Sequence, residues 1–334
     1  MLATVETVRG AVDTSRLGAT LMHEHVFITT PEFPENYPGI IGWDEEKKVA
    51  EAIGNLRDLK AAGIDSLLDL TVIGMGRYIP RLQRINEAVP DFNILVATGV
   101  YTYDGLPHYL SAVGPAGLGG GREPLVEMFV KDITEGIAGT GVKASALKVC
   151  TDKPGVTPTI ERLLRAVAKA HRATGVPIST HTDVATRRGL EQQAIFADEG
   201  VDLSRVVIGH SGDTNDLNYL KEILQRGSYL GMDRFGMEGG HFLTFEERVR
   251  VVADLCDLGF ADQLVLSHDA SCWMDWAPQE LRAGTPLEMP NWHFLHISQH
   301  VLPALKARGV TDDQIDTMLV RNPRKIFEAP RTSY

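Results

Sequence analysis

Eight short apolar runs rich in β-branched residues alternate with longer helical segments along nearly the whole chain. The expected strands are 19–28, 64–70, 94–100, 144–150, 177–182, 205–210, 229–233 and 263–268. The expected helices are 44–62, 77–88, 123–137, 157–173, 186–199, 215–226, 244–258 and 294–307. Nearly continuous apolar strands that are separated by helices are typical of a parallel sheet covered on both faces. The repeat therefore predicts an α/β fold, a (β/α)8 TIM barrel.

An open, doubly wound sheet is the alternative, but no glycine-rich phosphate turn follows the first expected strand. No linker-like composition divides the chain, so we expect a single domain over residues 1–334. Long connections at 29–43, 101–122 and 270–293 all follow strands. They would therefore lie at the C-terminal face of the barrel, where active sites of this fold are built. The segment 311–328 is expected to form an added C-terminal helix.

The composition is that of a globular protein, with 43% hydrophobic and 23% charged residues. The formal net charge is −11 and no basic cluster is present, which disfavours binding to nucleic acid. Cys150, Cys256 and Cys272 have no paired spacing, which indicates a reducing cytoplasm rather than a disulfide framework. We expect neither a signal peptide nor a membrane span, because no charged n-region or long apolar run is present.

His23 and His25 lie two residues apart in the first expected strand. Residues i and i+2 of a strand point to the same face, so the two imidazoles would converge. Neutral imidazole is the commonest metal ligand in proteins. A pair of hydrogen-bonded core histidines would give the same pattern, so the choice depends on what lies at the ends of later strands.

Four more residues of ligand type occur where later strands end. Lys148 lies in the fourth expected strand, His181 and His210 end the fifth and sixth, and Asp269 follows the eighth. Each residue alone has an ordinary structural explanation, such as a core histidine, an ion-paired lysine or an aspartate that caps a turn. Because the C-terminal strand ends of a barrel surround one centre, their joint recurrence favours a common site.

Lys148 is the unusual member, because an ammonium group has only donors and cannot bind a metal. Burial lowers the pKa of a lysine, and its neutral amine can add CO₂ to form an anionic carbamate. The same neutral amine could instead act as the Schiff-base nucleophile of an aldolase-type barrel. Four histidines, one carbamate and one aspartate would suit two divalent ions such as Zn²⁺, Co²⁺, Mn²⁺ or Fe²⁺.

The sequence around these residues resembles the phosphotriesterase family of the amidohydrolase superfamily. The motifs that carry the resemblance are His23-Glu-His25-Val-Phe, Gly99-Val-Tyr101, Leu147-Lys148-Val, Ser179-Thr-His181-Thr, Ile208-Gly-His210-Ser-Gly-Asp213, Leu266-Ser-His-Asp269 and Asn322-Pro-x-x-x-Phe327. Tyr101 and Arg234, at the ends of the third and seventh strands, are similar to residues of the phosphotriesterase-like lactonases. Loop packing and a surface ion pair are the structural alternatives for these two residues.

The loop that contains Cys272, Trp273 and Trp276 and returns at Trp292 resembles the lactonase loop that covers the acyl chain of the substrate. Packing beneath a lid would explain these aromatic residues equally well. The resemblance further implies a carboxylated Lys148 that bridges two metal ions, and a homodimer. Asp213 or Asp233 is expected to hydrogen-bond to ligand histidines.

The resemblance implies hydrolysis of N-acyl-homoserine lactones by a hydroxide that bridges two metals, with side activity on organophosphate triesters. Asp269 would carry the proton to the leaving alkoxide, and Tyr101 would donate a hydrogen bond to the carbonyl oxygen. The alternatives are a dedicated phosphotriesterase, a hydrolase of other esters, a metal-binding protein without turnover, and a Schiff-base aldolase that uses Lys148.

Overall fold

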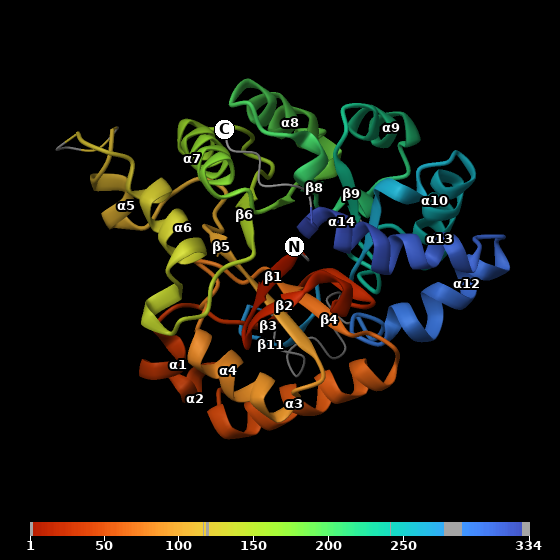
Figure 1. Cartoon of the computed structure of the whole chain (residues 1–334), viewed down its shortest axis with the longest axis horizontal. Helices are drawn as coiled ribbons and strands as arrows, with labels where there is room; N and C mark the ends of the chain where they lie inside the picture. Colours follow the sequence, from red (N-terminus) through yellow and green to blue (C-terminus); the bar gives the residue numbers. More distant parts are fainter. Residues whose placement is uncertain (1–2, 116, 118–119, 241, 277–288, 329–334) are drawn as a thin grey trace.

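The chain folds into a barrel of parallel strands surrounded by helices (Figure 1). The computed structural model describes all residues except 1–2, 116, 118–119, 241, 277–288 and 329–334. The strands of the barrel are β3 (Thr20–Ile28), β4 (Ser66–Asp69), β5 (Asn93–Gly99), β6 (Ala146–Cys150), β7 (Ile178–His181), β8 (Val206–Ile208), β9 (Tyr229–Met232) and β10 (Leu264–Leu266). Each of them pairs in parallel with its neighbour in the sequence, from β3 to β10. The predicted TIM-barrel class is confirmed.

The barrel closes through the residues that follow β10. Asp269 N donates to His23 O at 3.1 Å, and His25 N donates to Ala270 O at 2.9 Å. A further strand, β11 (Ser271–Met274), then pairs in parallel with β3. The eighth strand predicted over 263–268 is present as β10, whereas β11 is an additional strand within the predicted connection 270–293. Asp269, with a left-handed φ of 53°, separates the two. An L-residue in that region interrupts a regular strand.

The helices that follow the strands form the outer layer (Figure 1). Their sequence signals act as expected: the Thr157 side chain accepts from Ile160 N, and Thr244 forms a capping box with Glu247. Gly175 ends its helix with a left-handed φ of 74°. The outer helices are α3 (Glu45–Ala61), α4 (Ile79–Ala88), α6 (Pro124–Thr134), α7 (Pro158–Thr174), α8 (Arg188–Asp198), α9 (Leu217–Gln225) and α10 (Phe245–Asp257).

The last part of the chain is more divided than the sequence suggests. The expected helix at 294–307 consists of a π-helical turn (Ile297–Val301) and α12 (Leu302–Ala307). The tail consists of α13 (Asp312–Asp316), a second π-helical turn (Thr317–Arg321) and α14 (Asn322–Glu328). The predicted added C-terminal helix is therefore present in three short pieces.

Several elements have no counterpart among the expected ones. A hairpin of β1 (Thr4–Thr7) and β2 (Gly10–Asp13) lies at the N-terminal end of the barrel, where Val8 N donates to Ile94 O at 2.8 Å. Short helices occupy two of the long connections at the opposite end: α1 (Phe33–Asn36), α2 (Pro38–Ile41) and α5 (His108–Ala112). No helix in the described part of the chain has the length and apolar character required to cross a membrane.

Apolar side chains fill the barrel and the space between the barrel and the helices. Leu95, Ala97, Val207 and Val265 belong to the inner group and are at most 2% exposed. A packed barrel interior leaves the C-terminal strand ends as the place where polar side chains can surround a cavity.

Candidate metal centre

A cavity of about 170 Å³ opens at the C-terminal ends of the strands. All six residues predicted as metal ligands line it: His23, His25, Lys148, His181, His210 and Asp269. The other lining residues are Tyr101 and Arg234 together with the apolar side chains of Ile28, Met75, Met237, Met274, Trp276 and Trp292. The six predicted ligands come from five different strand ends and are brought together beneath an apolar cover.

His23 and His25 of β3 converge on Asp269, as the i, i+2 spacing predicts. Asp269 Oδ1 lies 3.4 Å from His23 Nε2 and 3.2 Å from His25 Nε2. Nζ of Lys148, from β6, lies 2.8 Å from the same nitrogen of His23. These polar atoms form one side of the cavity floor.

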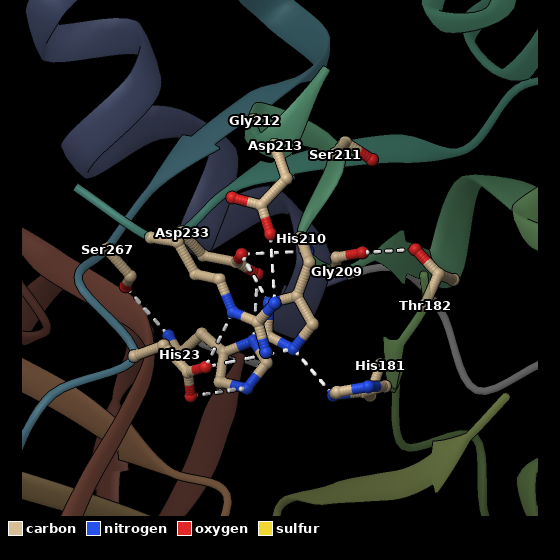
Figure 2. Close-up of polar contacts among 12 residues, drawn as sticks. His23, His181, Thr182, Gly209, His210, Ser211, Gly212, Asp213, Asp233 and Ser267 are labelled. Atoms are coloured by element: carbon tan, nitrogen blue, oxygen red, sulfur yellow. Dashed lines mark hydrogen bonds and ion pairs between the residues drawn. The ribbon is translucent and has the colours of Figure 1, made fainter. Parts of the chain in front are cut away.

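His181 and His210 form the other side of the floor, at the ends of β7 and β8. His210 Nε2 lies 2.8 Å from His181 Nδ1 (Figure 2). The ring of His210 also stacks on that of His23, with centroids 4.8 Å apart. The four histidines are thus one contiguous cluster, and each is at most 4% exposed.

Each of the four histidines is hydrogen-bonded at its outer ring nitrogen. Asp233 binds Nδ1 of both His23 and His210, at 2.8 and 2.9 Å (Figure 2). Thr71 Oγ1 lies 2.9 Å from His25 Nδ1, and Asp152 Oδ2 lies 2.8 Å from His181 Nε2. At each of the four histidines, the partner of the outer nitrogen is therefore a carboxylate or a hydroxyl oxygen that can accept the N–H.

This pattern of outer hydrogen bonds determines what the inner nitrogens offer. A neutral imidazole has one N–H and one lone pair. When the N–H is directed outward to an acceptor, the lone pair on the second nitrogen faces the cavity. On the cavity side, His23, His25 and Asp269 have ligand atoms that lie within 4.8 Å of one another. His23, His210 and Asp233 form a second such group, in which Asp233 binds the outer nitrogens. The donor set fits divalent metal ions.

Burial controls the protonation of this cluster. It lowers the pKa of His23 and of His210 well below the ordinary histidine value, and it lowers that of His181 to about 4. Burial also lowers the pKa of Lys148, which is 1% exposed. Neutral imidazoles and a neutral amine are the forms that bind metals or react with CO₂, so the environment favours the reactive form of each group.

Asp269 differs from its neighbours because its charge is stabilised. Burial alone would raise the pKa of this carboxyl group, but the neighbouring imidazoles of His23 and His25 and the guanidinium of Arg234 hold it below its ordinary value. Arg234 Nε donates to Asp269 Oδ2 at 3.0 Å, and its Nη1 donates to Asp213 Oδ2 at 2.9 Å. Asp269 is therefore an ionised carboxylate that faces the histidines.

The structure distinguishes the two aspartates expected to support the histidines. Asp233 contacts two of them, as described above. Asp213 instead lies between two arginines, because Arg248 Nη2 approaches its Oδ1 at 2.7 Å while Arg234 binds its other oxygen. Asp213 thus orients Arg234 against Asp269, and Arg234 belongs to a half-buried network that lines the cavity rather than to a surface ion pair.

A phosphotriesterase family model matches residues 3–327 of the chain. The chain belongs to the phosphotriesterase family. It is 58% identical over 324 residues to a phosphotriesterase homology protein of Mycobacterium tuberculosis, with 97% of each protein covered. It is 34% identical over 319 residues to an aryldialkylphosphatase of Saccharolobus solfataricus, covering 96% of this chain and 98% of that one.

A solved structure within the family has a similar architecture. It comes from the engineering of organophosphate hydrolysis activity from a weak promiscuous lactonase template. Its TM-score with this chain is 0.88 at 34% sequence identity, and the match covers 97% of this chain and 99% of the other. The homologues support a hydrolase that acts on esters of small molecules.

Two tyrosines lie beside His181, and only Tyr101 is predicted as a site residue by the sequence. The ring of Tyr101 packs edge-on against His181 at 5.7 Å, and the ring of Tyr103 lies 5.2 Å from the same histidine. Their hydroxyl groups are hydrogen-bonded to each other. Burial raises the pKa of both phenols, so each hydroxyl stays protonated and can donate a hydrogen bond. The Tyr-x-Tyr spacing after a strand is the signal that could have identified Tyr103.

The aromatic loop after β10 contributes only part of what was predicted. Trp276 and Trp292 line the cavity, and the intervening residues 277–288 lie outside the described part of the chain. Trp273 is 6% exposed and packs against Trp43, with ring centroids 5.0 Å apart. Cys272 is likewise absent from the cavity lining. Trp273 therefore faces the outer layer of the fold, and a contact of Cys272 or Trp273 with substrate stays a prediction.

Most of the residues that hydrogen-bond to the histidines are not predicted by the sequence. Asp152 follows the strand that carries Lys148, and Thr71 follows β4, but neither belongs to a recognisable spacing. Glu24 is 0% exposed and lies between His23 and His25 in β3, so its location beside the predicted ligands could have been inferred from the sequence.

Gly99 allows β5 to approach β6 closely beside Lys148. A Cβ at this position would lie 1.9 Å from Lys148 O, so only glycine fits here.

Proposed function

We propose that this protein is a binuclear metal-dependent lactonase. Its substrates would be N-acyl-homoserine lactones and related lactones, with organophosphate triesters hydrolysed as a side activity. The observation that carries the proposal is the cluster of inward-facing histidine nitrogens beside Asp269 and Lys148, beneath a cover of apolar side chains. The cluster fits metal-assisted hydrolysis, and the cover fits an acyl chain.

The residues that would hold the metals follow from the two halves of the cavity floor. His23 and His25 would hold one ion, and His181 and His210 the other, with Asp269 as a further ligand. Lys148, carboxylated on Nζ, would bridge the pair, and the ions would be Zn²⁺, Co²⁺, Mn²⁺ or Fe²⁺. When bound, such ions lower the pKa of water and polarise the ester oxygen.

The side chains of the chain itself would guide the substrate and the proton. The carboxylate of Asp269 would accept the proton of the attacking water and deliver it to the leaving alkoxide. Arg234 would hold Asp269 in place through the 3.0 Å hydrogen bond. The Tyr101 hydroxyl would donate to the substrate carbonyl oxygen, and Trp276 and Trp292 would exclude water from the acyl chain.

A dedicated phosphotriesterase, or a hydrolase of another ester, is the second candidate. The similarity to an aryldialkylphosphatase favours it, since a tetrahedral phosphorus centre resembles the tetrahedral intermediate of lactone opening. The deciding experiment compares kcat/KM for acyl-homoserine lactones of increasing chain length with kcat/KM for one phosphotriester. We expect the best lactone to exceed the triester, and a wide margin in favour of the triester would refute the lactonase proposal.

Two further measurements separate the remaining alternatives. Two tightly bound metal ions without hydrolysis of any lactone, ester or triester would indicate a binding protein. Borohydride trapping of a carbonyl compound on Lys148 would indicate an aldolase. Light scattering of the purified protein would test the homodimer that we also propose.

A further inference from the structure

The seam between the first and last barrel strands lacks a regular ladder of backbone hydrogen bonds. Among the described residues, β10 forms a ladder with β9 only, and the backbone hydrogen bonds to β3 are made by Asp269 and Ala270, which follow β10. Backbone N–H groups in a buried seam need acceptors from another source. At this seam a side chain of β3 supplies them.

The acceptor is the carboxylate of Glu24, which lies between His23 and His25. Its Oε1 accepts from His268 N at 2.8 Å and from His268 Nδ1 at 2.7 Å. Its Oε2 accepts from Ala270 N at 2.9 Å. The peptide N–H groups on both sides of Asp269 therefore end on one carboxylate.

This arrangement holds Asp269 in a conformation that its backbone would not otherwise favour. The residue has a left-handed φ of 53°, which is uncommon for anything but glycine. Such a conformation persists only where surrounding contacts fix it. Fixing the peptides before and after Asp269 aims its carboxylate at His25 Nε2, 3.2 Å away.

We propose that Glu24 is a positioning residue for the metal centre, which locks Asp269 in register with the two histidines of β3. The inference rests on the proposed metal-dependent function, but it concerns how the centre is built rather than what it hydrolyses. The same seam also anchors the cavity wall. Trp292 Nε1 donates to His268 O at 2.9 Å, and Ile297 N donates to His268 Nε2 at 3.0 Å.

The test measures metal affinity in variants of Glu24. Glu24→Gln replaces one acceptor oxygen with an NH₂ group, which would face an N–H donor and lose that hydrogen bond. Glu24→Asp keeps the charge, but its side chain is one methylene shorter. Cobalt is titrated into the metal-free protein in competition with a chelator, and the visible absorption of bound Co²⁺ reports ligand geometry. We expect Glu24→Gln to weaken binding by about 10- to 100-fold and Glu24→Asp by a smaller factor, with an altered cobalt spectrum in both.

Asn322 provides the matched control. It is also 0% exposed and also ties β10, since its Nδ2 donates to Ala261 O at 2.8 Å and to Leu264 O at 2.7 Å, at the far end of that strand. Asn322→Ala should lower the melting temperature and leave the cobalt affinity and spectrum unchanged. If Glu24→Gln does not fold, Glu24→Asp carries the comparison with the control.

Wild-type cobalt affinity in the Glu24 variants would overturn the proposal. An equal loss of affinity in Asn322→Ala would also overturn it, because the effect would then be general destabilisation. Failure of the proposed hydrolase activity is recognised separately, since wild-type protein would then bind cobalt but would open no lactone and cleave no triester.

Discussion

The floor and the cover of the cavity are held in place by different kinds of contact. Each histidine of the floor has a polar partner at its outer nitrogen, and Asp233 serves two of them at once. The cover is formed by Met75, Met237 and Met274 with aromatic rings, and unbranched thioether side chains adapt their shape easily. The floor can therefore keep one chemistry fixed while the cover changes its preference for substrates.

Loss of Lys148 should give the largest effect, because it removes the residue proposed to join both halves of the floor. We expect Lys148→Ala to lower kcat/KM for lactones and for phosphotriesters alike by about 10³-fold or more, equivalent to about 4 kcal/mol. Metal analysis should show fewer than two ions per chain. Bicarbonate with a short-chain carboxylic acid should restore part of the activity.

Lys48 is the control for that substitution. It is also a buried lysine, 6% exposed, but it pairs with Glu51 at 3.0 Å and lies outside the cavity lining. Lys48→Ala should retain the metal content and most of the activity. Full activity in Lys148→Ala without added acid would contradict the role of Lys148 in the metal centre.

Asp233→Asn should give the next largest effect, because one change alters the outer hydrogen bonds of both His23 and His210. We expect metal affinity to fall by about 10- to 100-fold, measured by chelator competition. Activity at saturating metal should fall by the same factor for lactone and triester. Asp132, which is half-buried and pairs with Arg77 at 2.9 Å outside the cavity, is the control: Asp132→Asn should leave metal affinity unchanged.

Changes in the cover should separate the substrates instead. Met237→Ala removes apolar surface from the cavity wall, and loss of one such contact is worth about 1–3 kcal/mol, or about 10-fold in rate at the lower end. We expect a 10-fold change in the ratio of kcat/KM between long-chain lactones and a small triester, with metal content unchanged. Met318, which is 0% exposed among the C-terminal helices, is the control. Met318→Ala should lower stability without changing that ratio, and equal losses on both substrates in Met237→Ala would contradict the distinction between floor and cover.

The same distinction explains what could be predicted from the sequence. His181, His210 and Asp269 were identifiable because their place depends only on where a strand ends, and the barrel repeat reveals the strand ends. Asp152 acts through a contact with His181, which is distant in sequence, so no local spacing indicates it. Glu24 could be located from its place between His23 and His25, but its partners His268 and Ala270 are distant in sequence. The sequence places Trp273 in the covering loop but does not show which way its ring faces, because its packing against Trp43 is a tertiary contact.

His171 lies outside the cavity lining, and the effect expected for it is the smallest. His171 of α7 is 1% exposed, and its Nδ1 donates to Val176 O at 2.7 Å. Burial lowers its pKa below the ordinary value of about 6.5. Between these two pKa values the unfolded chain binds a proton that the folded chain excludes, so stability falls as the pH falls below about 6.5.

The variant His171→Asn keeps a side-chain N–H donor but cannot titrate. Urea unfolding of the metal-free proteins should therefore show that the wild type loses more free energy of unfolding between about pH 7 and about pH 5 than the variant does. Each unit of pKa shift is equivalent to about 1.4 kcal/mol, and only this one residue contributes to the difference. Parallel pH dependence in the two proteins would mean that His171 titrates alike in the folded and unfolded states. Since His171 lies outside the cavity, the metal affinity of the variant should match that of the wild type, in contrast to any change at the histidines of the floor.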